Sequence, residues 1–440
     1  MRIMTLMLIY YSCALYGLFN PFFGLLFFVH ITIFRPESLA WGEATFGHLH
    51  LTTALLTLIG YFIHENREKG KFTDTYQRRN VLIFSFLIVW LVIVSILAQS
   101  SVVASFEKTV EMMKIFALCF LFSKLINTKD RLNLYVWVTV ISFGLLSFWG
   151  FMQGLAGNPR LDDLGPGGSS MTTASIALMA PLALSKVFDT SLAVRSRLVF
   201  LLCTISMALC IIWSFSRGGF LGLIVASLVF VIVTQHRTRI LLGLAVTVLL
   251  VLPFIPDTYS TRVSSIFADS QEKDQSSLSR PILWRIAFRI WQDHPITGVG
   301  LDNFSAVKDT YHDKVQDILE EYLSTSENIE EMRSTIFDRY RLPHGAYTGM
   351  MAETGLVGIS VFVIFMLRSI FCRFPALLAR SESDRNLYLQ VKAAQAGLIG
   401  FAVAALFADA QYVEMLYLQV FFVGAVRGHA DSLIAPDRKA

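Results

Sequence analysis

Charged residues are scarce in this sequence. Asp, Glu, Lys and Arg make up 16% of its 440 residues, whereas a soluble protein carries about 25%. Hydrophobic residues make up 54% of the chain, and apolar runs of about 17–25 residues, the length of a membrane-spanning helix, recur along it. The scarcity of charge excludes an ordinary soluble domain. It indicates an all-α, polytopic integral membrane protein.

Cysteine is missing from the long polar part of the chain. Cys13, Cys119, Cys203 and Cys210 lie in apolar runs, and Cys372 lies in a basic connection. Because no spacing typical of metal ligands occurs among them, we expect neither a disulfide framework nor a cysteine metal site. No small-residue cleavage site follows the first apolar run, so we expect that run to remain as an anchor.

Several well-known catalytic motifs are also absent. The sequence contains no Walker loop, no Rossmann glycine pattern and no Ser/His/Asp nucleophile motif. These absences exclude the common nucleotide-binding and serine-hydrolase sites. We expect no cofactor and no nucleic-acid partner.

Twelve apolar runs are candidate membrane spans, and "FNPFFG" interrupts the first of them. They cover about 3–34, 49–65, 80–98, 109–126, 131–153, 171–188, 197–214, 217–234, 239–255, 346–368, 391–408 and 412–427. Lys and Arg gather in alternate connections, such as "HENREKGKFTDTYQRR" and "RSIFCRFPALLARSESDR". The positive-inside rule places these connections and the C-terminus in the cytoplasm. We therefore expect about 12 transmembrane helices.

The longest polar segment lies outside the cytoplasm by this alternation, and it contains amphipathic helical patterns. It divides the chain into three expected regions. These are residues 1–255 with about nine spans, the external loop 256–345, and residues 346–440 with the last spans and a cytoplasmic tail. A loop of this length is usually functional or disordered, and its amphipathic patterns favour function.

Arg217 lies in a very short external turn, "WSFSRGGFLG", between two apolar runs. A cation at the membrane boundary is costly unless it is paired or faces water. Arg217 is either an interfacial arginine that reaches lipid headgroups or a ligand for an anion. The flanking Ser214, Ser216, Gly218 and Gly219 leave room for a phosphate, which favours the anion ligand.

The stretch "SSLSRPILWRIAFRIWQDHP" predicts an amphipathic helix in the external loop. We expect Ser279 to cap this helix and Pro281 to lie in its first turn. Its apolar face consists of Ile282, Leu283, Ile286, Ile290 and Trp291. Arg285 and Arg289 lie on one edge of that face, where they either meet acidic lipids or bind substrate. Arg280 is expected at the positive end of the helix, where anions bind.

His344 and Glu353 lie where the external loop enters the next apolar run. A neutral imidazole accepts a proton at ordinary pH, so His344 is a candidate general base. Glu353 lies inside the span and would hold the ring or pair with an arginine. Arg160 precedes "LDDLGPGGSS", a loop that either presents backbone N–H groups to an anion or is a flexible connection.

His48 and His50 form an i, i+2 pair in another external connection, "FGHLH". In an extended segment both rings point to one side, as two metal ligands would. A third ligand is missing from this stretch, and we expect no metal site there.

Several arginines and one histidine on the external membrane surface suit a lipid-linked substrate with a phosphate or pyrophosphate group. Guanidinium groups bind phosphate oxygens bidentately and stabilise a departing pyrophosphate. The histidine would deprotonate an incoming hydroxyl.

The blocks "SFSRGG", "SRPILWRIAFRIWQDHPITGVGLDNF" and "HGAYTGMMAETGLVG" resemble, in this order, those of the O-antigen ligase and O-antigen polymerase superfamily. The resemblance covers residues 80–430. "FRPESLAWG" with "GNPRLDDLGPGGSS" is similar to a subgroup of O-glycosylation ligases. The resemblance to the superfamily implies a multi-pass protein of the bacterial inner membrane with its active site in the periplasm.

The resemblance also implies roles for individual residues. His344 corresponds to the family's histidine, the general base; Arg217 and Arg280 correspond to its two pyrophosphate-binding arginines; Arg160, Arg285, Arg289 and Glu353 are further substrate-binding candidates. The expected reaction is a metal-independent, inverting glycan transfer from undecaprenyl pyrophosphate to lipid A–core or another glycan acceptor. Gly345 departs from the family, in which a polar, asparagine-like residue often follows the histidine.

Three alternatives remain open at this stage. An O-antigen polymerase and a protein O-oligosaccharyltransferase of the same superfamily share this chemistry. A transporter of lipid-linked glycans would require inverted repeats or charges near the midplane of several spans, and the sequence shows neither.

Overall fold

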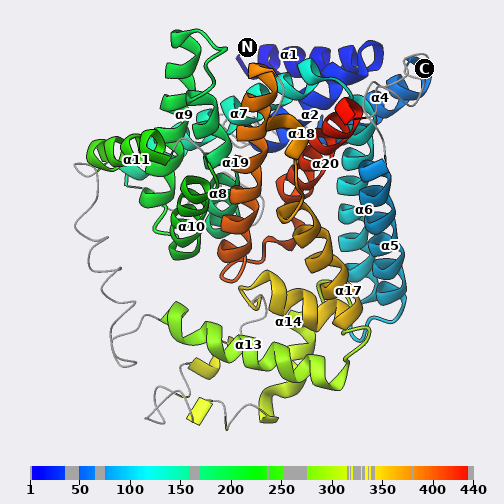
Figure 1. Ribbon diagram of the computed structural model, residues 1–440. Helices are drawn as coiled ribbons and strands as arrows, with labels where there is room; N and C mark the ends of the chain where they lie inside the picture. Colours follow the sequence, from blue (N-terminus) through cyan, green and yellow to red (C-terminus); the bar gives the residue numbers. More distant parts are fainter. Residues whose placement is uncertain are drawn as a thin grey trace.

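The computed structural model describes residues 2–34, 49–64, 75–157, 168–234, 237–251, 275–314, 342–378 and 381–434, with 317, 319–320, 329, 332–334 and 336–337. All regular structure within these residues is helical (Figure 1). The fold class expected from the scarcity of charge is therefore confirmed as all-α.

The helices follow the apolar runs closely. The longer ones are α1 (Arg2–Phe19), α2 (Pro21–Phe34), α4 (Leu49–His64), α5 (Thr75–Ile96), α6 (Val102–Leu125), α7 (Lys129–Leu155), α8 (Gly168–Val187), α9 (Val194–Trp213), α10 (Arg217–Val233), α11 (Arg237–Val251), α13 (Gln275–Asp293), α17 (Ala346–Ile370), α19 (Glu382–Ala404) and α20 (Glu414–Ile434). The short ones are α14 (Phe304–Val307), η3 (Lys308–Lys314), α18 (Pro375–Leu378) and η4 (Ala410–Tyr412).

Six of the described helices are long and apolar enough to cross a membrane. They are α5, α7, α8, α9, α17 and α19; α1, α2, α4 and α10 are apolar but shorter. Length and composition thus support a multi-pass membrane protein. The count of twelve spans stays a prediction.

The first apolar run is two helices rather than one span. Pro21 occupies the first position of α2, where its missing N–H costs nothing. The Oδ1 atom of Asn20 accepts a hydrogen bond from Phe23 N (3.1 Å) and so caps that helix. Gly60 of α4 lies so close to the carbonyl of Leu18 that a Cβ at this position would be 2.5 Å from its oxygen. The close approach therefore requires glycine. The "FNPFFG" break therefore forms the corner between α1 and α2, and α4 packs against this corner.

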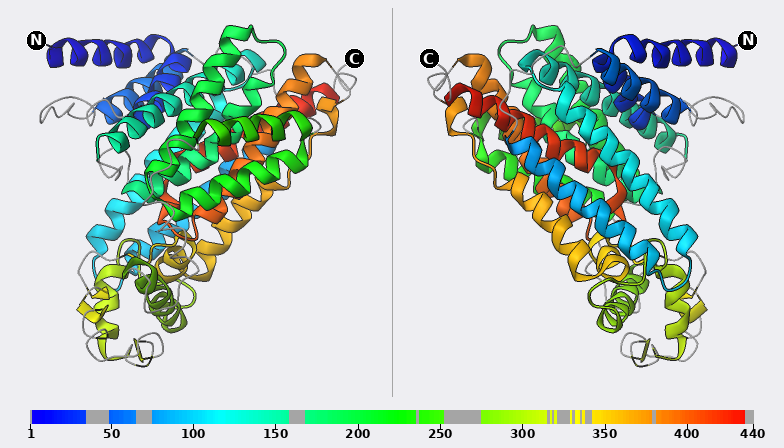
Figure 2. Two further views of the ribbon diagram at one scale, coloured as in Figure 1. Left: turned by 90° about the vertical axis from the view of Figure 1, so that its left-hand side faces the viewer. Right: turned by 90° about the vertical axis from the view of Figure 1, so that its right-hand side faces the viewer.

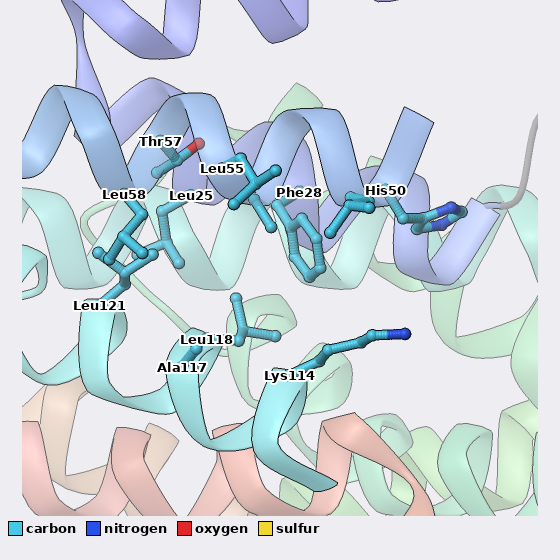
Figure 3. A pocket seen from close by; sticks show the side chains of 12 residues that line it. Leu25, Phe28, His50, Leu55, Thr57, Leu58, Lys114, Ala117, Leu118 and Leu121 are labelled. Carbon is cyan, nitrogen blue, oxygen red and sulfur yellow. The ribbon is translucent and has the colours of Figure 1, made fainter. Parts of the chain in front are cut away.

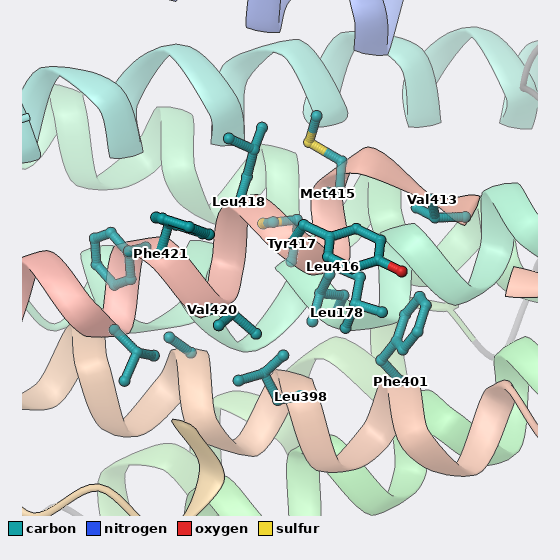
Figure 4. Packing of buried hydrophobic residues seen from close by; sticks show 14 of the residues in the cluster. Leu178, Leu398, Phe401, Val413, Met415, Leu416, Tyr417, Leu418, Val420 and Phe421 are labelled. Carbon is teal, nitrogen blue, oxygen red and sulfur yellow. The ribbon is translucent and has the colours of Figure 1, made fainter. Parts of the chain in front are cut away.

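α20 forms the centre of the bundle. Every residue from Met415 to Val426 is buried, as expected of a helix that is apolar on all sides. Figure 4 shows Leu416, Tyr417 and Val420 packed against Leu398 and Phe401 of α19. The Tyr417 hydroxyl donates to the carbonyl of Gln411 (2.7 Å), so its buried polar group is satisfied.

α13 and α14 lie together at one end of the bundle, at the level where α5, α6 and α17 end (Figures 1 and 2). Four residues of the predicted apolar face of α13 are buried and pack on residues of α14, η3 and α17 rather than on lipid, namely Ile282, Leu283, Ile286 and Ile290. Trp291, the fifth, is only partly buried. α13 begins at Gln275, so the expected Ser279 cap is wrong, and Pro281 lies inside the helix. Burial of the apolar face stabilises the helix enough to tolerate the backbone bond that Pro281 cannot make.

α17 is interrupted at Gly355, which has φ +65°. The stretch that follows α13 supplies the hydrogen bonds that the interruption removes. Val299 N donates to Ala352 O (3.0 Å), Gly300 N donates to Glu353 O (3.0 Å), and Leu356 N donates to Pro295 O (2.8 Å). The approach is too close for side chains: a Cβ at Gly355 would lie 2.0 Å from Ile296 O. α13, α14, η3 and the residues between them belong to the loop that the sequence predicts to be external, and they are called the external unit below. These hydrogen bonds fix the external unit to α17.

Candidate active site

His344 lies directly before α17, with a positive φ of 52°. Its Nδ1 atom is 3.4 Å from Oδ2 of Asp409, whose side chain is only 7% exposed. The other carboxylate oxygen of Asp409 accepts a hydrogen bond from Gly345 N (3.2 Å). The carboxylate therefore binds both the backbone and the ring of the His344–Gly345 segment. A non-glycine residue at positive φ is held there only when its surroundings fix it, and such residues cluster at active sites.

The geometry suits a general base. A carboxylate beside Nδ1 favours the tautomer that carries its proton on Nδ1, which leaves Nε2 as an acceptor. The His344 side chain is 37% exposed, so a substrate hydroxyl has access to it. Catalytic hydrogen bonds are often long without substrate and shorten when it binds, so 3.4 Å fits this role.

The segment that carries His344 is anchored on the connection between α19 and η4. Ala346 N donates to Ala405 O (2.8 Å), and the Tyr347 hydroxyl donates to Ala402 O (2.9 Å). A Cβ at Gly345 would lie 3.0 Å from Leu406 O and 3.1 Å from Trp284 Nε1. Close packing thus leaves little room for the side chain that often follows the family's histidine.

Arg217 begins α10, and three residues separate it from the end of α9 at Trp213. The very short turn expected from the sequence is therefore present. Ser216 caps the helix: its hydroxyl accepts from Gly219 N (3.3 Å) and from Thr173 Oγ1 of α8 (2.9 Å). Phe215, inside the turn, has a positive φ of 53°. Both helix beginnings, α8 and α10, therefore meet beside Arg217.

Two aromatic residues connect the Arg217 turn to His344. Phe407 lies against Gly218, whose Cβ would be 2.9 Å from its own. The ring of Phe407 is 6.2 Å from the ring of Trp284 on α13. Trp284 in turn reaches Gly345, as described above. The Arg217 turn, α13 and the histidine segment therefore converge around one aromatic pair.

The arginines of α13 differ in their surroundings. Arg280 is partly buried and lies one helical turn before Trp284, on the same face. Arg285 is exposed. Arg289 makes a bidentate ion pair with Asp317, at 3.2 and 2.5 Å. Arg280 thus shares the face of α13 that carries Trp284, the residue that contacts the histidine segment.

Glu353 does not hold the ring, a task that the structure gives to Asp409. The Glu353 side chain is buried, 4% exposed, and accepts from the Tyr412 hydroxyl (3.0 Å) and from Phe304 N (3.5 Å). A phenol keeps its proton at ordinary pH, so the Tyr412 hydroxyl is the donor in this bond and Oε2 of Glu353 is the acceptor. Glu353 therefore joins α17 to α14 and η4.

Sequence reasoning missed Asp409. The one signal available was an acidic residue between two late apolar runs, in "LFADAQYVEM". An ionisable residue at a membrane boundary is a functional candidate by default, and this rule would have selected it.

Two candidates lie outside the described residues, namely Arg160 and His48. The Nε2 atom of His50 is 3.3 Å from Ile31 O; a carbonyl only accepts, so this nitrogen donates and is not a metal ligand. Across the described ranges, His, Cys, Asp and Glu form no group of three or more that could hold a metal ion.

The fold and site together define a class: a helical, multi-pass membrane protein with a histidine–aspartate pair next to α13 and to α10, which begins with Arg217. Residues 202–363 match the family model described as O-Antigen ligase. This match supports membership of the O-antigen ligase superfamily. The matched range includes Arg217, Arg280 and His344 and ends before Asp409.

The N-terminal part matches a different family. Residues 1–159 fit a model described as a family of unknown function (DUF5935), which covers α1 to α7. No curated protein matches the chain.

Proposed function

We propose that this protein is a glycan ligase. It transfers a glycan from undecaprenyl pyrophosphate to a hydroxyl of lipid A–core, on the periplasmic side of the bacterial inner membrane. One observation carries this proposal: His344 faces a buried carboxylate beside the two arginine-bearing elements. The match to the O-antigen ligase family model supports it.

In the proposed reaction, His344 removes the proton of the acceptor hydroxyl as its oxygen attacks the anomeric carbon of the donor sugar. The bond from that carbon to the pyrophosphate oxygen breaks, and the leaving group takes the electron pair. A single displacement of this kind inverts the anomeric configuration. Arg217 and Arg280 bind the developing pyrophosphate charge, and no metal ion is required. Asp409 positions the ring of His344.

Arg285 and Arg160 are weaker candidates for donor binding. Arg285 is exposed on α13, and Arg160 belongs to the connection that leads into α8, whose beginning meets α10. Arg289 already binds Asp317, and we assign it to the stability of the external unit rather than to the substrate. Glu353 likewise has a role in packing. The proposed topology is about 12 spans with residues 256–345 in the periplasm.

The test is a reconstituted reaction. Purified protein is mixed with an undecaprenyl-pyrophosphate-linked glycan and lipid A–core, with no energy source, and the products are resolved by gel electrophoresis and mass spectrometry. We expect transfer with the wild type and none with His344→Ala. His294→Ala is the matched control, because His294 also belongs to the external unit and follows α13; it should retain activity.

Each rival predicts a different product. Undiminished transfer by His344→Ala would reject the base assignment. A glycan lengthened on the carrier lipid would indicate a polymerase, and a glycan attached to a polypeptide hydroxyl would indicate a protein O-oligosaccharyltransferase. Movement of lipid across the membrane without transfer would favour a transporter.

A further inference from the structure

A largely apolar groove lies away from the candidate active site. It has a volume of about 390 Å³, and its twelve lining residues all come from α2, α4 and α6. Figure 3 shows that Lys114 and His50 lie at one end of the groove, whereas Leu58 and Leu121 lie at the other. A ligand for this groove must therefore be polar at one end and apolar along its length.

The polar end is positively charged. Lys114 is exposed on the middle of α6, and none of the groove's lining residues is acidic. The remaining polar side chain, Thr57, donates its hydroxyl to Thr53 O (2.7 Å) and offers little to a ligand.

Lys114 follows the charged residues Glu107, Lys108 and Glu111 on α6, and the residues from Ile115 to Phe122 that come after it are apolar. Lys108 and Glu111 already pair with each other, at 2.7 Å. Lys114 therefore lies where the charged part of the helix meets its apolar part. Its charge is complementary to an anionic group.

The groove is continuous with the outer, apolar surface of the bundle. Leu51 and Leu55 line it and are also 46% and 48% exposed. A hydrocarbon chain can therefore enter sideways from the membrane, and a cavity of this size suits one small ligand.

We propose that this groove binds an anionic phospholipid of the surrounding membrane. One acyl chain lies between α4 and α6, and the phosphate is held by Lys114 with His50 beside it. Lysine binds phosphate as a point charge. The occupant is distinct from the glycan donor, because α10, α13 and the segments around His344 and Asp409 contribute nothing to the lining. The site belongs to the N-terminal family of unknown function and does not depend on glycan transfer.

The test uses the full chain, delipidated in detergent, and native mass spectrometry to measure bound phosphatidylglycerol and phosphatidylcholine. We expect Lys114→Gln to weaken phosphatidylglycerol binding by about tenfold, the effect of one lost charge-assisted contact, and to leave phosphatidylcholine unchanged. Lys124→Gln is the matched control: Lys124 is on the same helix, lies over Phe120 and does not line the groove. It should bind both lipids as the wild type does.

A second variant fills the groove. Ala117→Trp should weaken the binding of both lipids, while the circular dichroism of the helices stays unchanged. Equal losses in Lys114→Gln and Lys124→Gln would overturn the proposal. It would also fail if undecaprenyl phosphate displaced phosphatidylglycerol at a lower concentration than phosphatidylglycerol itself needs for binding, since the groove would then belong to the donor.

Discussion

At the scale of single residues, the base and its partner come from different parts of the chain. The sequence predicted His344, because a histidine before an apolar run is conspicuous. It offered Glu353 either as the residue that holds the ring or as the partner of an arginine, because Glu353 is a carboxylate inside an apolar run. Asp409 is 64 positions beyond Gly345. Only the packing of α17 on the α19–η4 connection brings it to the ring, and no pattern in the sequence measures that distance.

Asp409→Asn should lower kcat about a hundredfold, with KM changed less than twofold, because the amide keeps the volume but no longer favours the proton on Nδ1. Steady-state kinetics of the reconstituted transfer measure both constants. Asp409→Glu should recover part of kcat. A change in KM with kcat unaltered, or no recovery of kcat with glutamate, would assign Asp409 a purely structural role.

Arg280 and Arg289 provide a second test at this scale, because they share one helix. Arg280→Gln should reduce kcat/KM by about a hundredfold or more, as expected for a lost ligand of a developing charge. Arg289→Gln breaks an exposed ion pair with Asp317, worth about 1 kcal/mol or less, and should reduce transfer less than twofold. Kinetics and thermal unfolding of both variants decide this, and the reverse order would contradict the assignment.

At the scale of helices, apolar periodicity was a good guide to existence and a poor guide to limits. Four of the five residues predicted for the apolar face of α13 are buried, since a 3.6-residue pattern records such a face directly; Trp291 is only partly buried, and the buried Ala287 was not predicted. Its start was misplaced by a few residues, because capping signals at Ser279 and Pro281 were outweighed by tertiary packing. The interruption at Gly355 left no periodic signal at all, since it depends on a distant stretch of backbone.

Gly355→Ala should destabilise the protein by about 2–4 kcal/mol, because the new Cβ meets Ile296 O and the positive φ strains the backbone. Gly157→Ala is the control: it has φ +88° but open space around it, so it should cost only about 1–2 kcal/mol. Thermal unfolding in one detergent compares them. Equal losses would show that strain, and not the contact with Ile296, dominates.

At the scale of the whole molecule, composition predicted the class of structure, and the distribution of Lys and Arg predicted the orientation in the membrane. The division of the chain into membrane regions and an external loop stays a prediction. The corner between α1 and α2 was visible as a break, but its meaning was not. Whether the two helices cross the membrane depends on how α4 packs over them, and hydropathy does not contain that information.

The orientation is testable with cysteine labelling in intact cells. Asp309→Cys in the external unit should react with a membrane-impermeant maleimide, whereas Arg385→Cys at the start of α19 should react only after the membrane is opened. Both positions are exposed. The background is a chain without Cys13, Cys119, Cys203, Cys210 and Cys372. Labelling of Arg385→Cys in intact cells would contradict the predicted topology.

The interruption of α17 has a mechanical consequence. It divides the helix into two rods, and the joint between them is filled by backbone that comes directly after α13. The outer rod begins two residues after His344, so tilting it must either carry α13 along or break the two hydrogen bonds that Val299 N and Gly300 N donate to it. Outward movement of α13 would therefore pull the rod behind His344 against its anchors at Ala405 and Asp409, which couples the position of α13 to that of the imidazole.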